Sequence, residues 1–131
     1  MGYSLGLRSL MNLRGVNPDL VMIVKRAIQI SEIDFTVVEG LRTVSRQKEL
    51  FKQGATHTMR SRHIHGFAVD IAPYVGGKIR WDWPLFYKLA DAMKRAAAEV
   101  GVAVEWGGDW TTFKDGPHWQ LPHKLYPDPK S

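Results

Sequence analysis

Histidine and aspartate side chains gather in two short stretches of this sequence, and both residue types can bind a metal ion. The first stretch, SRHIHGFAVD, contains His63, His65 and Asp70, and the second, DGPH, contains Asp115 and His118. The sequence has no cysteine, so His, Asp or Glu would have to bind any such ion. A hydrolytic zinc site takes three ligands of this kind, and a further carboxylate moves the proton of the attacking water. The two stretches together hold the residues that this chemistry needs.

The spacing of the first stretch poses a geometrical problem. Phe67–Asp70 predicts a buried strand that ends in a charge, and a buried charge needs a partner. His63 precedes Asp70 by seven residues, and on one continuous strand this odd separation would place the two side chains on opposite faces. Gly66 permits a bend or bulge between them. We therefore expect both side chains to reach the same side.

The second stretch could complete the site from a distant part of the chain. His118 begins the last predicted strand, and the turn at Gly116 and Pro117 would let Asp115 point toward the same centre without binding metal. Each element also has an ordinary structural interpretation, because an Asp followed by Gly commonly forms a turn. The remaining histidines, which we expect to be structural or exposed, are His57, His65 and His123. Spacing alone leaves both interpretations open.

The two stretches resemble a known two-part signature. Residues 61–70 fit the pattern S-x-H-x-x-G-x-A-x-D of the zinc peptidases that include D-alanyl-D-alanine dipeptidases and carboxypeptidases. Asp115-x-x-His118 fits its second part, an acidic residue three before a histidine. The upstream stretch VVEGLRT…RQKELFKQGAT makes the chain similar to bacteriophage L-alanyl-D-glutamate endopeptidases, which are endolysins. The resemblance spans roughly residues 15 to 122.

The resemblance implies a metal site with a proton-transferring residue beside it. The ligands of one Zn²⁺ ion would be His63, Asp70 and His118. Asp115 would be the general base; many relatives have Glu at this position, whereas the phage enzymes resemble this sequence in using Asp.

The resemblance also implies residues that contact the substrate or the developing oxyanion. Arg42, in GLRT, corresponds to an arginine that binds a substrate carboxylate or polarises the scissile carbonyl. Ser61 would support the site by hydrogen bonding, and Gln47 matches a family position without an evident chemical role.

The elements that must position these residues indicate a small α+β domain, with helices packed on an antiparallel sheet and the zinc site at the sheet. Asn17 and Pro18 form a typical helix start. Helices are predicted over 20–30, 43–53 and 84–100, and strands over 34–40, 67–75, 78–81, 102–106 and 118–121. We expect one domain over 1–131, with an N-terminal segment at 1–14 and a loose tail at 123–131.

The net charge of the sequence bears on the kinds of partner that the protein could bind. The formal charge of +5 indicates either a solvated basic surface, which is the more common case, or an anionic partner such as nucleic acid, a lipid surface or an acidic wall polymer. The Lys and Arg residues are dispersed along the chain, which argues against sequence-specific binding of nucleic acid, and we expect no nucleic-acid partner. Neither a secretory signal peptide nor an apolar membrane span is evident, so we expect no stable membrane insertion. We also expect a monomer.

These observations predict a zinc-dependent peptidoglycan endopeptidase that cuts the stem peptide between L-Ala and D-Glu. Such an endolysin would be made in the host cytoplasm without a signal peptide and would act on peptidoglycan in the periplasm. The alternatives are a D-Ala-D-Ala carboxypeptidase or dipeptidase with the same zinc site, a non-haem iron oxygenase, and a basic cell-wall or nucleic-acid binding module without activity.

Overall fold

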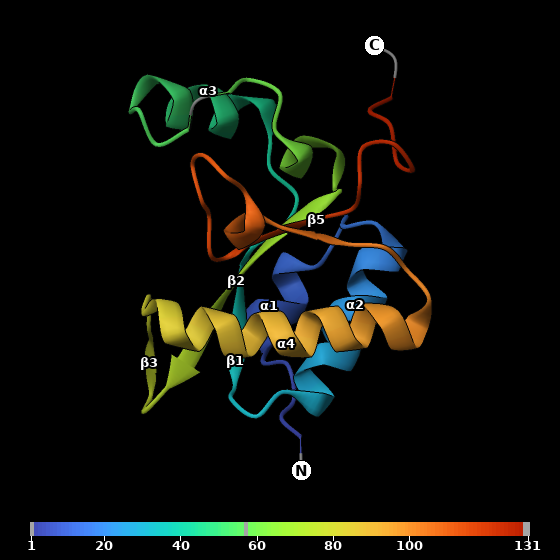
Figure 1. Ribbon diagram of the computed structural model, residues 1–131. Coiled ribbons are helices and arrows are strands. Elements are labelled where there is room, and N and C mark those ends of the chain that lie inside the picture. The colour runs from blue at the N-terminus through green and yellow to red at the C-terminus, as the bar shows by residue number, and fades with distance from the viewer. Residues whose placement is uncertain (1, 57, 130–131) are drawn as a thin grey trace.

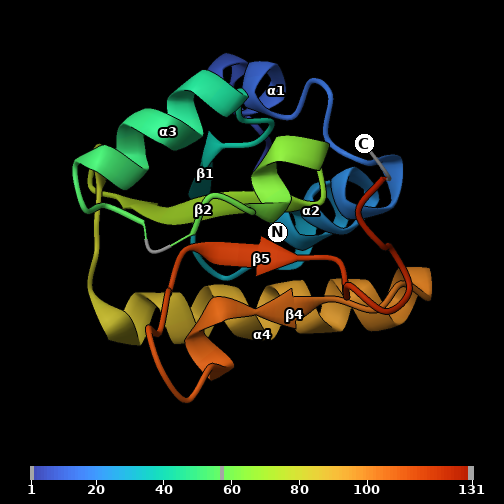
Figure 2. The same cartoon turned by 90° about the horizontal axis from the view of Figure 1, so that it is seen from above.

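An antiparallel sheet forms the centre of the fold in the computed structural model, which describes residues 2–56 and 58–129. Its strands are β1 (Phe35–Glu39), β2 (Ala68–Val75), β3 (Lys78–Ile79), β4 (Glu105–Trp106) and β5 (His118–Gln120). The strand order is β1-β2-β5-β4, with β3 paired to the end of β2 (Figures 1 and 2). The long strand β2 therefore lies between β1 and β5.

Helices and short 3-10 turns surround this sheet. The α-helices are α1 (Leu7–Asn12), α2 (Pro18–Ile30), α3 (Val44–Lys52) and α4 (Trp83–Val100), and the 3-10 turns are η1 (Arg62–His65) and η2 (Gly107–Asp109). α2 and α4 pack against each other, and α4 also contacts β2. In Figure 2, β4 and β5 lie over α4, whereas α3 lies toward the β1 edge. No helix in the described part of the chain is long and apolar enough to cross a membrane.

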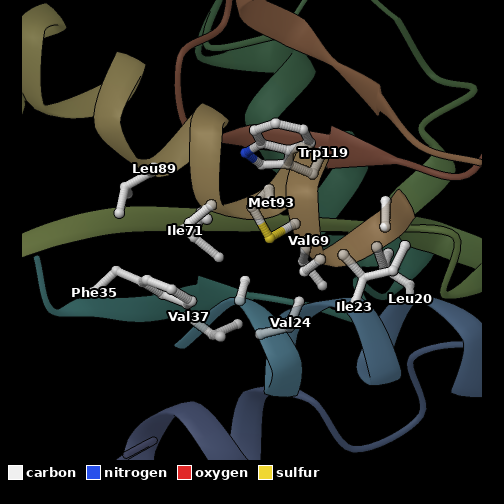
Figure 3. Packing of buried hydrophobic residues seen from close by; sticks show 14 of the residues in the cluster. Leu20, Ile23, Val24, Phe35, Val37, Val69, Ile71, Leu89, Met93 and Trp119 are labelled. Atoms are coloured by element: carbon white, nitrogen blue, oxygen red, sulfur yellow. The ribbon is translucent and has the colours of Figure 1, made fainter. Parts of the chain in front are cut away.

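The hydrophobic core lies between the sheet and the pair α2 and α4. Val69 and Ile71 of β2 are fully buried in it, as is the indole of Trp119 from β5 (Figure 3). From the helices the core receives Leu20, Ile23, Val24, Leu89 and Met93. Because strand residues alternate between faces, Asp70, between Val69 and Ile71, points to the face away from this core. Because Val69 and Ile71 face the core, Asp70, the one charged residue in β2, must point to the opposite face.

The α+β prediction is confirmed, and the differences are local. Helix α1 was not predicted, because it is short and has no side-chain cap. The buried Ser9 in it accepts a hydrogen bond from the Val37 amide. The strand predicted over 102–106 is only Glu105–Trp106, because Val102 and Val104 pack on the core without joining the ladder.

The segment after residue 122 has no helix or strand up to residue 129, but it is attached to the body. Arg62 donates a hydrogen bond to Asp128, and the Tyr126 hydroxyl donates one to Asp19. These contacts differ from the expectation of a loose tail. They lie beyond the reach of local sequence patterns, because the partners are far apart in the chain.

Candidate metal centre

Two of the expected ligands come from directly paired positions on neighbouring strands. Asp70 of β2 lies opposite His118 of β5 in the antiparallel register. Both side chains point to the face away from the helical core, and the His118 Nδ1 atom lies 3.4 Å from Asp70 Oδ1. The ladder and the core behind it therefore position this half of the site.

The third expected ligand, His63, lies on η1, a 3-10 turn that precedes β2, and the bend expected at Gly66 lies between the two. Ser61 caps the turn, because its hydroxyl accepts a hydrogen bond from the His63 amide at 3.2 Å. Gly66 ends the turn with φ of +75°, and a Cβ there would lie 2.5 Å from the Gly15 carbonyl oxygen. Gly66 does redirect the chain, and the His63 Nε2 atom consequently lies 3.3 Å from Asp70 Oδ1.

Hydrogen bonds outside the cluster orient both imidazole rings. His63 Nδ1 donates to the Gly40 carbonyl at 2.9 Å, and His118 Nε2 donates to Gln120 Oε1 at 2.8 Å. Each ring thus turns its other nitrogen toward Asp70. Such outer hydrogen bonds are the usual way in which proteins hold a metal-binding imidazole.

The donor atoms of this cluster fit a metal ion. One atom from each of His63, Asp70 and His118 lies within 4.8 Å of the others. His63 Nε2 and Asp70 Oδ1 are buried and have no hydrogen-bond partner in the described part of the chain. Buried polar atoms without partners are rare in folded proteins. Two imidazole nitrogens and one carboxylate oxygen are also the donor set of catalytic zinc sites.

The charge balance also calls for a cation. Burial would raise the pKa of Asp70, but the imidazoles of His118 and His63 outweigh it and hold the pKa well below its usual range. Burial would lower the pKa of His118, but the Asp70 carboxylate raises it overall. The centre therefore needs positive charge around an ionised Asp70, which bound protons or a metal ion can supply.

Asp115 lies in the same cleft but outside the three-residue cluster. Its backbone closes a turn, because its amide donates to the Gly107 carbonyl and its carbonyl accepts from the His118 amide. The Trp106 indole anchors the turn to the core by donating to the Gly116 carbonyl at 2.7 Å. Burial, together with the charge of Asp70, raises the pKa of the Asp115 carboxyl. This carboxyl is thus a proton acceptor with increased basicity.

Arg42 also lines the cleft, and a partly buried hydrogen-bond network holds it. Its guanidinium donates to Glu39, to Gln47 Oε1 at 2.7 Å and to the Ser61 hydroxyl at 3.4 Å. Gln47 is fully buried and does not line the cleft; its amide nitrogen donates to the Thr58 carbonyl at 2.6 Å. Gln47 therefore connects Arg42 to the loop that precedes Ser61. Its position indicates support for Arg42, not direct contact with a ligand.

The other histidines do not join the cluster where the structure describes them. His65 and His123 are exposed, and His57 lies outside the described residues. Sequence reasoning missed Gln120 and Glu39, which orient His118 and Arg42. Gln120 had a usable signal, because it lies two residues after His118 on a strand and so shares its face. Trp110 also lines the cleft, with its ring centroid 5.1 Å from that of His118.

Comparisons with known proteins agree with this geometry. The family model of the phage L-alanyl-D-glutamate peptidases matches residues 1–121. The chain is 35% identical to the L-alanyl-D-glutamate peptidase of Escherichia phage T5, over 88% of this chain and 87% of that protein. It is 33% identical to the peptidoglycan L-alanyl-D-glutamate endopeptidase CwlK of Bacillus subtilis, over 74% of this chain and 66% of that protein. The crystal structure of the L-Ala D-Glu endopeptidase ChiX of Serratia marcescens superposes with a TM-score of 0.91 and 46% identity, covering 97% of this chain and 96% of that one.

Proposed function

The chain belongs to the phage L-alanyl-D-glutamate peptidase family, and from that premise we propose that it hydrolyses the bond between L-Ala and D-Glu in the peptidoglycan stem peptide. The observation that carries the proposal is the buried cluster of His63, Asp70 and His118, whose inner atoms lack partners, with Asp115 beside it in one cleft. A binding module would have no need for such a cluster.

His63, Asp70 and His118 would hold one Zn²⁺ ion. When bound, zinc supplies Lewis acidity at the scissile carbonyl and makes water acidic enough to lose a proton near neutral pH. The two imidazoles are neutral ligands and Asp70 carries one negative charge, so this ligand set leaves a net positive charge in the centre. That charge favours a developing oxyanion.

Asp115 would move the proton. The residue lines the cleft without joining the ligand cluster, and its raised pKa strengthens it as a base. In the proposed reaction its carboxylate takes a proton from the attacking water, and the carboxylic acid then returns that proton to the departing amine of D-Glu. The water oxygen forms a bond to the L-Ala carbonyl carbon, and the C–N bond to D-Glu then breaks. The products are the L-Ala carboxylate and the free amine of D-Glu.

Arg42 would stabilise charge on the substrate. Its guanidinium lines the cleft, and Glu39, Gln47 and Ser61 fix its position. A preorganised donor of this kind stabilises the transition state because it needs no reorganisation when negative charge develops. Ser61 contributes twice, since its hydroxyl also caps the turn that carries His63.

The setting of the reaction follows from the family. We infer that the protein acts on peptidoglycan in the periplasm during phage-induced host lysis, after synthesis in the host cytoplasm. The net charge of +5 suits an acidic wall polymer. We infer further that it acts as a monomer and without nucleic acid.

Digestion of purified Gram-negative peptidoglycan would test the proposal. The protein is incubated with and without a chelator, and mass spectrometry identifies the released fragments. New amino-terminal D-Glu with L-Ala left on the glycan, lost on chelation and restored by zinc, is the expected result. Release of terminal D-Ala alone would replace this proposal with a carboxypeptidase, and no release by a folded, zinc-loaded protein would exclude both.

A further inference from the structure

A second hollow continues the cleft beyond Asp115. Residues from two segments line it: Ala55, Thr56 and Thr58 from one, and Trp110 and residues 113–115 from the other. We call this hollow the outer pocket. Thr56, Thr58, Trp110 and Asp115 also line the cleft that contains the metal-type cluster. The two hollows are therefore parts of one groove, and Asp115 lies where they meet.

The position of Asp115 gives the groove a direction. In the proposed reaction Asp115 passes a proton to the amine that departs, so the D-Glu nitrogen must come within hydrogen-bond distance of its carboxyl. The ligand cluster lines only the first cleft, Phe113 and Lys114 line only the outer pocket, and Asp115 lines both. The L-Ala carbonyl belongs at the cluster. The peptide that follows the D-Glu nitrogen is then directed into the outer pocket.

The outer pocket presents one apolar and one cationic group at its rim. Phe113 has φ of +52°, a backbone conformation that is uncommon for bulky residues, and the residue as a whole is 70% exposed. Backbone conformations of this kind are concentrated at sites that bind ligands. Lys114 is exposed, and among the described residues it forms no ion pair and is the one cation that lines this pocket.

We propose that the outer pocket binds the departing part of the stem peptide and that Lys114 pairs with a free carboxylate on it. This inference rests on the proposed function. D-Glu joins the next stem residue through its side-chain carboxyl, so its α-carboxylate is free, and a diaminopimelate residue in the third position carries another. Trp110 and Phe113 would cover the aliphatic part of this segment. Lys114 therefore selects an acidic peptide over its amidated form.

A substrate-and-variant cycle tests the pairing. Three soluble muropeptides are compared: the parent peptide, one with the D-Glu α-carboxyl amidated, and one with the free third-residue carboxyl amidated. For the parent, Lys114→Gln should raise KM about threefold and leave kcat unchanged, as for one partly exposed ion pair. Lys114→Gln should not raise KM for the amidated peptide that lacks the carboxylate with which Lys114 pairs. The matched control Lys78→Gln, on β3 and outside the groove, should change neither constant.

The outcomes separate this inference from the function on which it rests. A Lys114→Gln effect of equal size on all three peptides, or no effect on any, would overturn the pairing while the endopeptidase activity stands. Absence of L-Ala–D-Glu cleavage by the zinc-loaded wild type would overturn both.

Phe113 offers a second variant that separates binding from folding. Asn tolerates a positive φ better than Phe, so Phe113→Asn removes the ring without adding backbone strain. We expect a higher KM with a melting temperature that is unchanged or higher. A lower melting temperature with an unchanged KM would assign the ring to folding and remove it from the pocket.

Discussion

The two halves of the metal-type centre are positioned by different physical means. Asp70 and His118 are paired across β2 and β5, with Val69 and Trp119 buried behind them. His63 lies on the short turn η1, which lacks such support from a ladder. That turn is held by individual polar contacts, such as the hydrogen bond from the His63 amide to the Ser61 hydroxyl.

This difference determines how each half can fail. The strand half is held by hydrophobic burial and by the hydrogen bonds of the strand ladder. A substitution among these supports should therefore lower the stability of the whole sheet. The turn half depends on a few hydrogen bonds, each with a net contribution of about 1 kcal/mol. Changes in the supports of the turn should therefore alter metal binding and catalysis without unfolding the protein.

Loss of a ligand on the strand half should have the largest effect. Asp70→Asn keeps the shape of the side chain but removes the charge between His63 and His118, so we expect zinc affinity and activity to fall at least about 100-fold. Zinc stoichiometry after dialysis and a titration with a competing chelator would measure the loss. Asp91→Asn, in an exposed ion pair on α4, is the matched control. Retention of zinc at wild-type affinity by Asp70→Asn would refute this ligand assignment.

Replacement of the carboxylate beside the cluster should separate catalysis from metal binding. Asp115→Asn cannot accept a proton, and we expect kcat to fall by about 10²–10⁴ while zinc content stays unchanged. Steady-state cleavage of a muropeptide, with zinc measured on the same samples, gives both values. If zinc were lost in parallel, Asp115 would be acting as a ligand and its role as the base would have to be abandoned.

The sequence predicted the strand half better than the turn half, for a physical reason. The alternation of Val69, Asp70 and Ile71 shows directly which residue leaves the core. The position of His63 depends on long-range contacts of its neighbours, such as the approach of Gly66 to the Gly15 carbonyl, which no local pattern encodes. For the same reason, Gln47 and Arg42 could be named from a resemblance, but their mutual hydrogen bond needed the fold.

Gln47 therefore provides a test that only the structure suggests. Gln47→Leu fills most of the same volume but leaves the Thr58 carbonyl and one Arg42 donor without their partner. We expect a loss of about 1–3 kcal/mol in the free energy of unfolding and a fall of about tenfold in kcat/KM. Zinc affinity should stay close to wild type, because the side-chain hydrogen bonds of Gln47 in the described part of the chain go to Arg42, Thr56 and Thr58 and not to the ligand cluster. A kcat/KM unchanged despite lower stability would show that Arg42 keeps its position without Gln47.

The smallest effect is expected at a support that acts on His63 only through the neighbouring residue Arg62. Arg62 precedes His63, and its guanidinium is held by Asp128 at 2.8 Å, by the Leu121 carbonyl at 2.9 Å and by the ring of Phe67. Asp128→Asn removes only the charge of one of these three partners, on a side chain that is about a third exposed. We expect zinc affinity to fall by no more than about fivefold and the melting temperature to change little.

A control variant at another ion pair tests whether Asp128→Asn lowers zinc affinity through the turn η1. Glu99→Gln breaks the ion pair between Arg26 and Glu99, which is remote from the cluster and should leave zinc affinity unchanged. Calorimetric zinc titrations of both variants give the comparison. If Asp128→Asn lowers affinity and Glu99→Gln does not, the contact between Arg62 and Asp128 positions the His63 turn. Equal affinities in the two variants would mean that the contact with Asp128 does not help to hold η1, whose start and end Ser61 and Gly66 fix.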